Sequence, residues 1–159
     1  MSIQVGDKIP KATLNYLKDG VQAIDTDELF GGRKVVMFAV PGAFTPTCSQ
    51  RHLPSYVDKA SDPKSRGIDT IACVAVNDAF VMGAWGKAQN CGDNIMMLAD
   101  GSGDFTRAVG LELDARRNGL GMRSQRYSML VEDGVVKTLN VEAPGKFEVS
   151  DADTMLKAL

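Results

Sequence analysis

Cys48 is the residue of this sequence best placed to act as a nucleophile. It ends the segment 41–48 (PGAFTPTC), which directly follows the apolar run 35–40. A buried strand that ends at a Pro-Gly turn and continues into a helix leaves free backbone N–H groups at the start of that helix. These donors and the helix dipole stabilise a thiolate, which is the nucleophilic form of cysteine. The segment therefore predicts a reactive thiol at the edge of a sheet.

Three further residues have types that suit a site around such a thiolate. Thr45 lies three residues before Cys48, so its hydroxyl can reach the same small pocket. Pro41 covers the turn, removes one backbone donor and keeps water from the sulfur. Arg126 begins the segment 126–131 and presents a fixed fork of donors, which can bond sulfur and a peroxide oxygen at once. Such a site suits peroxide cleavage, in which a thiolate attacks one oxygen and the other leaves with negative charge.

Composition limits the classes of protein and partner. A chain of 159 residues with 44% hydrophobic and 24% charged residues predicts one domain, residues 1–159, with an ordinary core. The net charge of -2 argues against nucleic acid as the main partner. No apolar run approaches the roughly 18 residues of a membrane span, so we expect no membrane partner.

Cysteine and histidine usage predicts the compartment and argues against a metal site. The N-terminus has no basic region followed by an apolar stretch, so no secretory signal is expected. Three cysteines without a signal indicate reduced thiols in a cytoplasmic protein. The spacing of Cys48, Cys73 and Cys91 matches no zinc pattern, and the chain has a single histidine.

The order of the expected elements predicts an α/β fold. Strands are expected at residues 12–17, 21–24, 34–40, 69–76, 95–98, 127–131 and 135–141. Helices are expected from 26 to the glycines at 31–32, from 47 to about 59, from 77–78 to about 90, over 105–109, and after Ser150 as the expected cap. Strands that alternate with helices, followed by a hairpin and a last helix, favour a sandwich with a mixed central β-sheet flanked by helices. Cys48 then lies at the carboxyl edge of that sheet, where sites of open α/β folds gather.

Several blocks of the sequence resemble one enzyme family. The pattern Pro41-x-x-x-Thr45-x-x-Cys48 is similar to the active-site signature of the peroxiredoxins. Blocks 48–56, 74–85, 123–129 and 132–142 resemble the type II, or peroxiredoxin-5-like, branch, and the likeness extends from about residue 5 to 159. The resemblance implies a thioredoxin-like fold and a thiol peroxidase that reduces hydrogen peroxide and alkyl hydroperoxides, with no metal or organic cofactor.

The same resemblance implies roles for individual residues. Cys48 matches the peroxidatic cysteine, which becomes a sulfenic acid after attack. Thr45 matches the threonine that binds the peroxide, Pro41 the shielding proline, and Arg126 the arginine that polarises sulfur and substrate. A homodimer built around the active-site edge is also implied, for which the candidate contacts are Phe44, Phe80 and Trp85, with core packing as the alternative for each.

The chain departs from the family pattern in the regeneration half of the cycle. Segment 142–150 (EAPGKFEVS) has no resolving cysteine where some members carry one. Cys73 is expected to be a buried apolar residue of a strand, and Cys91 an exposed or half-buried thiol without a role. We therefore favour a one-cysteine cycle in which glutathione and glutaredoxin regenerate Cys48, with thioredoxin as the next choice of reductant.

Some alternatives stay open from the sequence. His52 follows Cys48 by four residues and is either a catalytic base or a structural residue that orients Arg126 or the dimer edge. Arg116 and Arg117 are expected in a solvated basic loop. The protein is either a thiol peroxidase or a redox-sensing binding module in which oxidation of Cys48 changes a surface. A disulfide oxidoreductase is disfavoured because no Cys-x-x-Cys motif is present.

Overall fold

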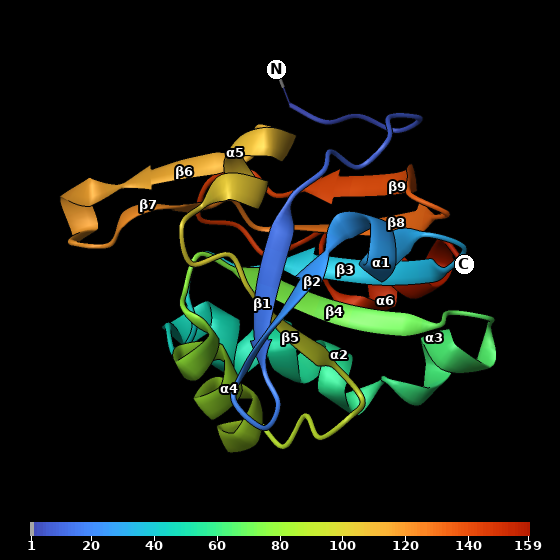
Figure 1. The fold of residues 1–159 in the computed structure, drawn as a ribbon, viewed down its shortest axis with the longest axis horizontal. Coiled ribbons are helices and arrows are strands. Elements are labelled where there is room, and N and C mark those ends of the chain that lie inside the picture. Colours follow the sequence, from blue (N-terminus) through green and yellow to red (C-terminus); the bar gives the residue numbers. More distant parts are fainter. Residues whose placement is uncertain (1) are drawn as a thin grey trace.

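A seven-stranded mixed β-sheet lies at the centre of the computed structural model, which describes residues 2–159 (Figure 1). The strand order is β2-β1-β5-β4-β3-β8-β9. The strands are β1 (Thr13–Leu17), β2 (Val21–Asp25), β3 (Lys34–Ala39), β4 (Thr70–Ala75), β5 (Met96–Ala99), β8 (Tyr127–Glu132) and β9 (Val135–Val141). The helices are α1 (Thr26–Phe30), η1 (Cys48–His52), α2 (Leu53–Asp58), α3 (Ser61–Ser65), α4 (Ala79–Ala88), α5 (Asp104–Val109), η2 (Arg116–Asn118) and α6 (Ala152–Lys157).

Strand β3 is the middle of the core because both of its faces are apolar. It pairs with β4 in parallel and with β8 in antiparallel register. Successive side chains of a strand point to opposite faces. Val36 and Phe38 therefore pack with residues of α2, α4 and α6, whereas Val35 and Met37 pack with residues of α1 and α5. The mixed sheet flanked by helices that the sequence predicts is thus observed.

The first hairpin forms as predicted. Strands β1 and β2 pair antiparallel, and their turn places Asp19 and Gly20 at φ of 53° and 97°. This tight turn requires positive φ at both Asp19 and Gly20, and an Asp-Gly pair adopts that conformation at low cost. The expected start of the last helix needs correction, because Asp151 rather than Ser150 is the N-cap of α6. The Ser150 hydroxyl instead donates to the buried carboxylate of Glu142.

A second hairpin lies outside the central sheet. Strands β6 (Glu112–Ala115) and β7 (Gly121–Ser124) form a two-stranded antiparallel ribbon that projects from the body of the protein (Figure 1). The basic pair Arg116–Arg117 is exposed at its tip, so the loop is solvated as expected but belongs to a hairpin. The sequence did not predict these strands because their segments, ELDA and GMRS, are only four residues long, which is too short for alternation to be a clear signal.

Residues 2–159 contain no helix that is both long and apolar enough to cross a membrane.

Candidate active site

Cys48 lies in the first turn of a helical segment that begins at Pro46. Ser49 N–H donates to the carbonyl of Thr45 over 2.9 Å, which closes the first turn. Pro46 at the start is favourable because its missing N–H would have had no helical partner. The Cys48 side chain is fully buried. The predicted strand, turn and helix therefore place the thiol below the surface at the end of β3.

The turn before this helix is held by Thr45 and strained at Phe44. The Thr45 hydroxyl donates to the carbonyl of Gly42 over 2.7 Å, so its oxygen lone pairs remain able to accept a bond. Phe44 has a φ of 64°, which is unfavourable for a residue with a Cβ and costs about 1–3 kcal/mol. Pro41 is half-buried at the start of the same turn. Thr45 and Pro41 thus belong to the turn that leads directly into the helix of Cys48.

The helix around Cys48 departs from the continuous α-helix that the sequence predicts. Residues Cys48–His52 form a π-helical turn in which Leu53 N–H donates to the Cys48 carbonyl. The next residue, Pro54, has no N–H, so the Ser49 carbonyl lacks a donor from the helix. The Gln89 side chain supplies one at 3.1 Å. Trp85 also donates to the Ser49 hydroxyl at 2.9 Å, and α4 thereby supports the turn that carries Cys48.

Arg126 meets Cys48 because of the strand register. Ala39 at the end of β3 pairs with Tyr127 at the start of β8, which brings the preceding Arg126 to the edge where the Cys48 helix begins. Its Nη2 group donates to Sγ of Cys48 at 3.1 Å. Its Nη1 group donates to Nδ1 of His52 at 2.9 Å. Arg126 lies far from Cys48 and His52 in the sequence, and the structure brings it into direct contact with both.

His52 is a neutral residue that orients Arg126. Its ring is fully buried, and its Nε2 lies 2.9 Å from the carbonyl of Ser150. Because a guanidinium only donates, Nδ1 must accept from Arg126 and Nε2 must carry the proton. Burial, and then the charge of Arg126, lower the pKa of His52 from 6.5 to about 3. Of the two roles left open by the sequence, the contacts favour orientation of Arg126 over that of a base.

A buried carboxylate fixes the loop behind His52. Glu142 accepts from the N–H groups of Glu148, Val149 and Ser150 and from the Ser150 hydroxyl, at 2.6 to 3.0 Å. Burial alone would raise the pKa of Glu142, but these bonds outweigh it and hold the pKa below its usual value. Tyr56 also donates to the carbonyl of Ser150 at 2.9 Å. Hydrogen bonds thus run from Glu142 through Ser150, His52 and Arg126 to Cys48.

Phe147 of the same loop lies over the polar network. Its ring centroid is 4.8 Å from that of His52. The guanidinium carbons of Arg51 and Arg126 lie 4.8 and 5.9 Å from the ring centroid. Such contacts favour a cation over the face of the ring. The loop that has no cysteine therefore contributes an aromatic side chain and a carbonyl acceptor to the site.

The other two cysteines are buried and unpaired. Cys73 is buried within strand β4, as predicted, where it pairs with Phe38 of β3. Burial raises the pKa of its thiol well above the usual value. The expectation of an exposed or half-buried Cys91 is wrong, because only 1% of it is exposed. The Cys91 N–H donates to the Gly86 carbonyl. This bond turns the chain back toward the core just after α4 ends, so that Cys91 packs in the core. Burial raises the pKa of Cys91 to about 11.

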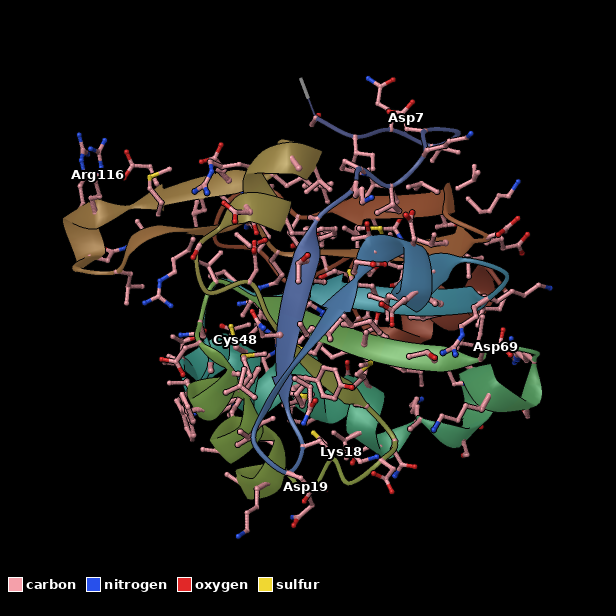
Figure 2. The ribbon with its side chains drawn as sticks, viewed as in Figure 1. Asp7, Lys18, Asp19, Cys48, Asp69 and Arg116 are labelled. Atoms are coloured by element: carbon pink, nitrogen blue, oxygen red, sulfur yellow. The ribbon has the colours of Figure 1, made fainter. Side chains whose placement is uncertain are left out.

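The assembled group can perform nucleophilic chemistry with stabilisation of negative charge. A thiol, a guanidinium held on two sides and a hydroxyl with free lone pairs gather at the start of one helix. Figure 2 shows Cys48 beside α4 and away from Arg116 at the tip of the hairpin. No cluster of three or more His, Cys, Asp or Glu residues suited to a metal occurs in the described part, residues 2–159. Glu142, Phe147 and Gln89 carry no local sequence signal, since each acts through long-range contacts.

Comparisons with known proteins agree over nearly the whole chain. A family model described as Redoxin matches residues 4–156. The chain is 54% identical to Peroxiredoxin-2E, chloroplastic, of Arabidopsis thaliana, over 99% of this chain and 70% of the relative. Reduced Prx3 from Vibrio vulnificus in complex with H2O2 is similar with a TM-score of 0.94 and 57% identity, over 98% of each chain. Peroxiredoxin 5 from Alvinella pompejana is similar with a TM-score of 0.86 and 39% identity, over 98% of this chain and 97% of that one.

Proposed function

This chain belongs to the Redoxin family and, within it, to the type II, peroxiredoxin-5-like peroxiredoxins, and we propose that Cys48 is the peroxidatic cysteine of this thiol peroxidase. Its fold is the thioredoxin-like fold of peroxiredoxins. The contact of 3.1 Å between Arg126 Nη2 and Cys48 Sγ carries the proposal. A cation in direct contact with sulfur stabilises the thiolate and the charge that develops during attack.

The proposed substrates are hydrogen peroxide and alkyl hydroperoxides. The Cys48 thiolate attacks one oxygen of ROOH, so an S–O bond forms while the O–O bond breaks. The departing RO⁻ takes up a proton and leaves as water or an alcohol. Sulfur is oxidised to the sulfenic acid, and the peroxide is reduced by the same two electrons.

Each neighbour of Cys48 has a proposed part in this step. Arg126 donates to sulfur and to a peroxide oxygen, since its fork has donors beyond those used in the structure. Thr45 accepts from the hydroxyl of the peroxide, because its own proton is held by the Gly42 carbonyl. Pro41 shields the thiolate from water at the start of the turn.

We propose a one-cysteine cycle for regeneration. A glutathione thiol attacks the sulfenic sulfur, which releases water and leaves a mixed disulfide on Cys48. A second thiol, delivered through glutaredoxin, then forms a disulfide with the first glutathione and frees Cys48. The proposal is supported by the cysteine-free loop 142–150 and by the complete burial of Cys73. Thioredoxin is the alternative reductant.

We also propose that the protein is a cytoplasmic antioxidant enzyme that forms a homodimer. Phe44 and Phe80 are 56% and 64% exposed, and Phe44 lies in the active-site turn, which supports an interface at that edge. Phe80→Glu, with Phe44 and Trp85 left unchanged, should raise the monomer fraction measured by analytical ultracentrifugation. Free thiols at all three cysteines in the described residues suit a reducing compartment.

A steady-state peroxide assay tests the proposal. Wild type should consume hydrogen peroxide faster with glutathione and glutaredoxin than with thioredoxin and its reductase, and Cys48→Ser should be inactive with both. Equal peroxide consumption by wild type and Cys48→Ser would favour the redox-sensing binding module instead.

Mass spectrometry of peroxide-treated protein tests the one-cysteine cycle separately. The expected products are the sulfenic acid of Cys48 and, with glutathione, the mixed disulfide. A stable disulfide from Cys48 to Cys73 or Cys91 as the main product would contradict this cycle. Cys73→Ser and Cys91→Ser serve as matched controls.

A further inference from the structure

One peptide group of the active-site turn, between Gly42 and Ala43, is bonded on both of its sides. Its carbonyl oxygen, which belongs to Gly42, accepts from the Thr45 hydroxyl over 2.7 Å. Its N–H group, which belongs to Ala43, donates to Oδ1 of Asn77 over 2.9 Å. A trans peptide group is planar, and its carbonyl and N–H point in opposite directions. The Asn77 side chain therefore fixes the plane of the peptide whose carbonyl directs the Thr45 hydroxyl.

The sheet register explains why Asn77 reaches this turn. Strands β3 and β4 run in parallel with Ala39 opposite Val74, so the chain leaves both strands at the same edge of the sheet. Asn77 follows β4 and precedes Asp78, the N-cap of α4, which accepts from the N–H of Val81. A strand on one side and a helix on the other thus anchor Asn77. Its half-buried side chain is presented to the turn by rigid elements.

Arg123 packs against the same turn from the β6–β7 hairpin. Its Nη1 donates over 3.3 Å to the carbonyl of Val76, the residue before Asn77. A Cβ atom added at Gly42 would lie 3.2 Å from this Nη1 and 3.1 Å from Cγ2 of Thr45. Glycine therefore allows a close approach at this position. The start of the turn is thus confined by the guanidinium and by Thr45, in addition to its bond with Asn77.

The turn depends on such support because the backbone of Phe44 is strained. Its φ of 64° lies in the left-handed region, which persists for a residue with a Cβ only when the surrounding structure fixes it. Loss of the acceptor at Asn77 leaves the Ala43 N–H without its partner, so the peptide before it is free to rotate. Rotation turns the Gly42 carbonyl, and the Thr45 hydroxyl then loses the acceptor that fixes its direction.

We propose that Asn77 is a positioning residue for peroxide reduction and acts through the 42–43 peptide on the Thr45 hydroxyl. The inference rests on the proposed function, in which Thr45 accepts from the hydroxyl of the peroxide. A misplacement of about 1 Å can cost about 10²-fold in rate. Asn77 bonds the turn, whereas the sulfur of Cys48 is bonded by Arg126. Asn77 should therefore affect attack on peroxide and leave the reactivity of the thiolate toward other electrophiles unchanged.

The ratio of two rates tests this assignment. Oxidation of Cys48 by hydrogen peroxide is measured by stopped flow, and alkylation of Cys48 by iodoacetamide reports the thiolate without using Thr45. In Asn77→Leu, the ratio of oxidation to alkylation should fall about tenfold. Asn77→Asp keeps an oxygen acceptor for the Ala43 N–H, so its ratio should stay within about threefold of wild type. Asn15→Leu removes an asparagine hydrogen bond from the first hairpin and should leave the ratio unchanged.

A double-mutant cycle shows whether Asn77 acts through Thr45. Thr45→Val removes the hydroxyl that Asn77 is proposed to orient. In this background Asn77→Leu should change the ratio by less than about twofold, because two residues that act through one hydroxyl are not additive. A further tenfold loss in the double variant would overturn the assignment.

Failure of this role differs from failure of the proposed function. An unchanged ratio in Asn77→Leu, including an equal fall of both rates, would overturn the role of Asn77, because it would indicate no effect or a purely structural one. A wild type that peroxide oxidises no faster than free cysteine would overturn the proposed function, and the role of Asn77 with it. If circular dichroism shows that Asn77→Leu does not fold, Asn77→Ala takes its place with the same expectations.

Discussion

Arg126 donates from Nη1 to Nδ1 of His52 over 2.9 Å while its Nη2 group reaches the Cys48 sulfur. The direction of this bond fixes the imidazole as the neutral tautomer with its proton on Nε2. The Nε2–H group in turn donates to the Ser150 carbonyl. His52 therefore holds the guanidinium in one orientation, and an imidazole with both nitrogens engaged has no free lone pair with which to act as a base.

His52→Leu should lower the rate of peroxide reduction about tenfold. Leucine fills the apolar surroundings of the ring but cannot accept from Arg126, so the guanidinium loses its orientation toward sulfur. Stopped-flow measurement of Cys48 oxidation by hydrogen peroxide gives the rate constant directly. His52→Gln is the matched control, since its amide can accept from Arg126 and donate to Ser150. Equal rates for His52→Leu and wild type would exclude the positioning role.

Arg126→Gln should lower the same rate constant by about 10²–10³, the usual cost of removing one donor that stabilises developing charge. Arg126→Lys tests whether charge alone is enough. A lysine keeps the charge but cannot contact His52 and Cys48 through a planar fork, so we expect it to remain far below wild type. Circular dichroism should be native for both variants. A lysine variant with the wild-type rate would refute the requirement for the fork.

Burial of a neutral His52 predicts a loss of stability in mild acid. Its pKa is about 3 in the folded protein and near 6.5 when unfolded, so the unfolded chain binds the extra proton between these values. Above pH 6.5 both states are neutral and the residue has no effect on pH dependence. Below pH 6.5 stability falls by up to about 1.4 kcal/mol per pH unit.

Urea unfolding at pH 7.0, 6.0 and 5.0 measures this effect. The range above pH 4.5 avoids the titration of Glu142, whose lowered pKa affects stability only in stronger acid. His52→Gln has no titrating ring and should show a flatter profile than wild type. Parallel profiles for the two proteins would mean that the folded protein binds a proton at His52 after all.

The sequence predicts the elements of this fold well where short-range chemistry determines them. The Asp19-Gly20 turn, the apolar run of β3 and the Pro-Gly turn before Cys48 each carry a local signal that the structure confirms. Arg126 was found through its place at the start of a strand and through the family resemblance. The register between β3 and β8 then explains why it meets Cys48.

Long-range contacts that neither a local pattern nor the family resemblance indicates could not be predicted. The π-helical turn at Cys48 requires Gln89 from another helix to bond the Ser49 carbonyl, and no local pattern indicates that pairing. Cys91 was expected near the surface because it precedes a Gly-Asp turn, but the backbone bond to Gly86 buries it. Serine is a residue type favoured at helix N-caps, but the Ser150 hydroxyl donates to the carboxylate of Glu142 instead.

Glu142→Gln should destabilise the fold by about 1–3 kcal/mol and slow peroxide reduction. The amide keeps the size of the side chain but offers one acceptor oxygen in place of two, so some of the N–H groups of residues 148–150 lose their partner in a buried place. The Ser150 carbonyl that holds His52 and Tyr56 belongs to the same segment, and its movement would loosen Arg126. Urea unfolding gives the free-energy change, and hydrogen exchange of the 148–150 amides should accelerate. Glu148→Gln, an exposed carboxylate in the same loop, is the control and should match wild type in both measurements. Unchanged amide exchange in Glu142→Gln would show that the loop is held by its other contacts, such as the packing of Phe147 on His52.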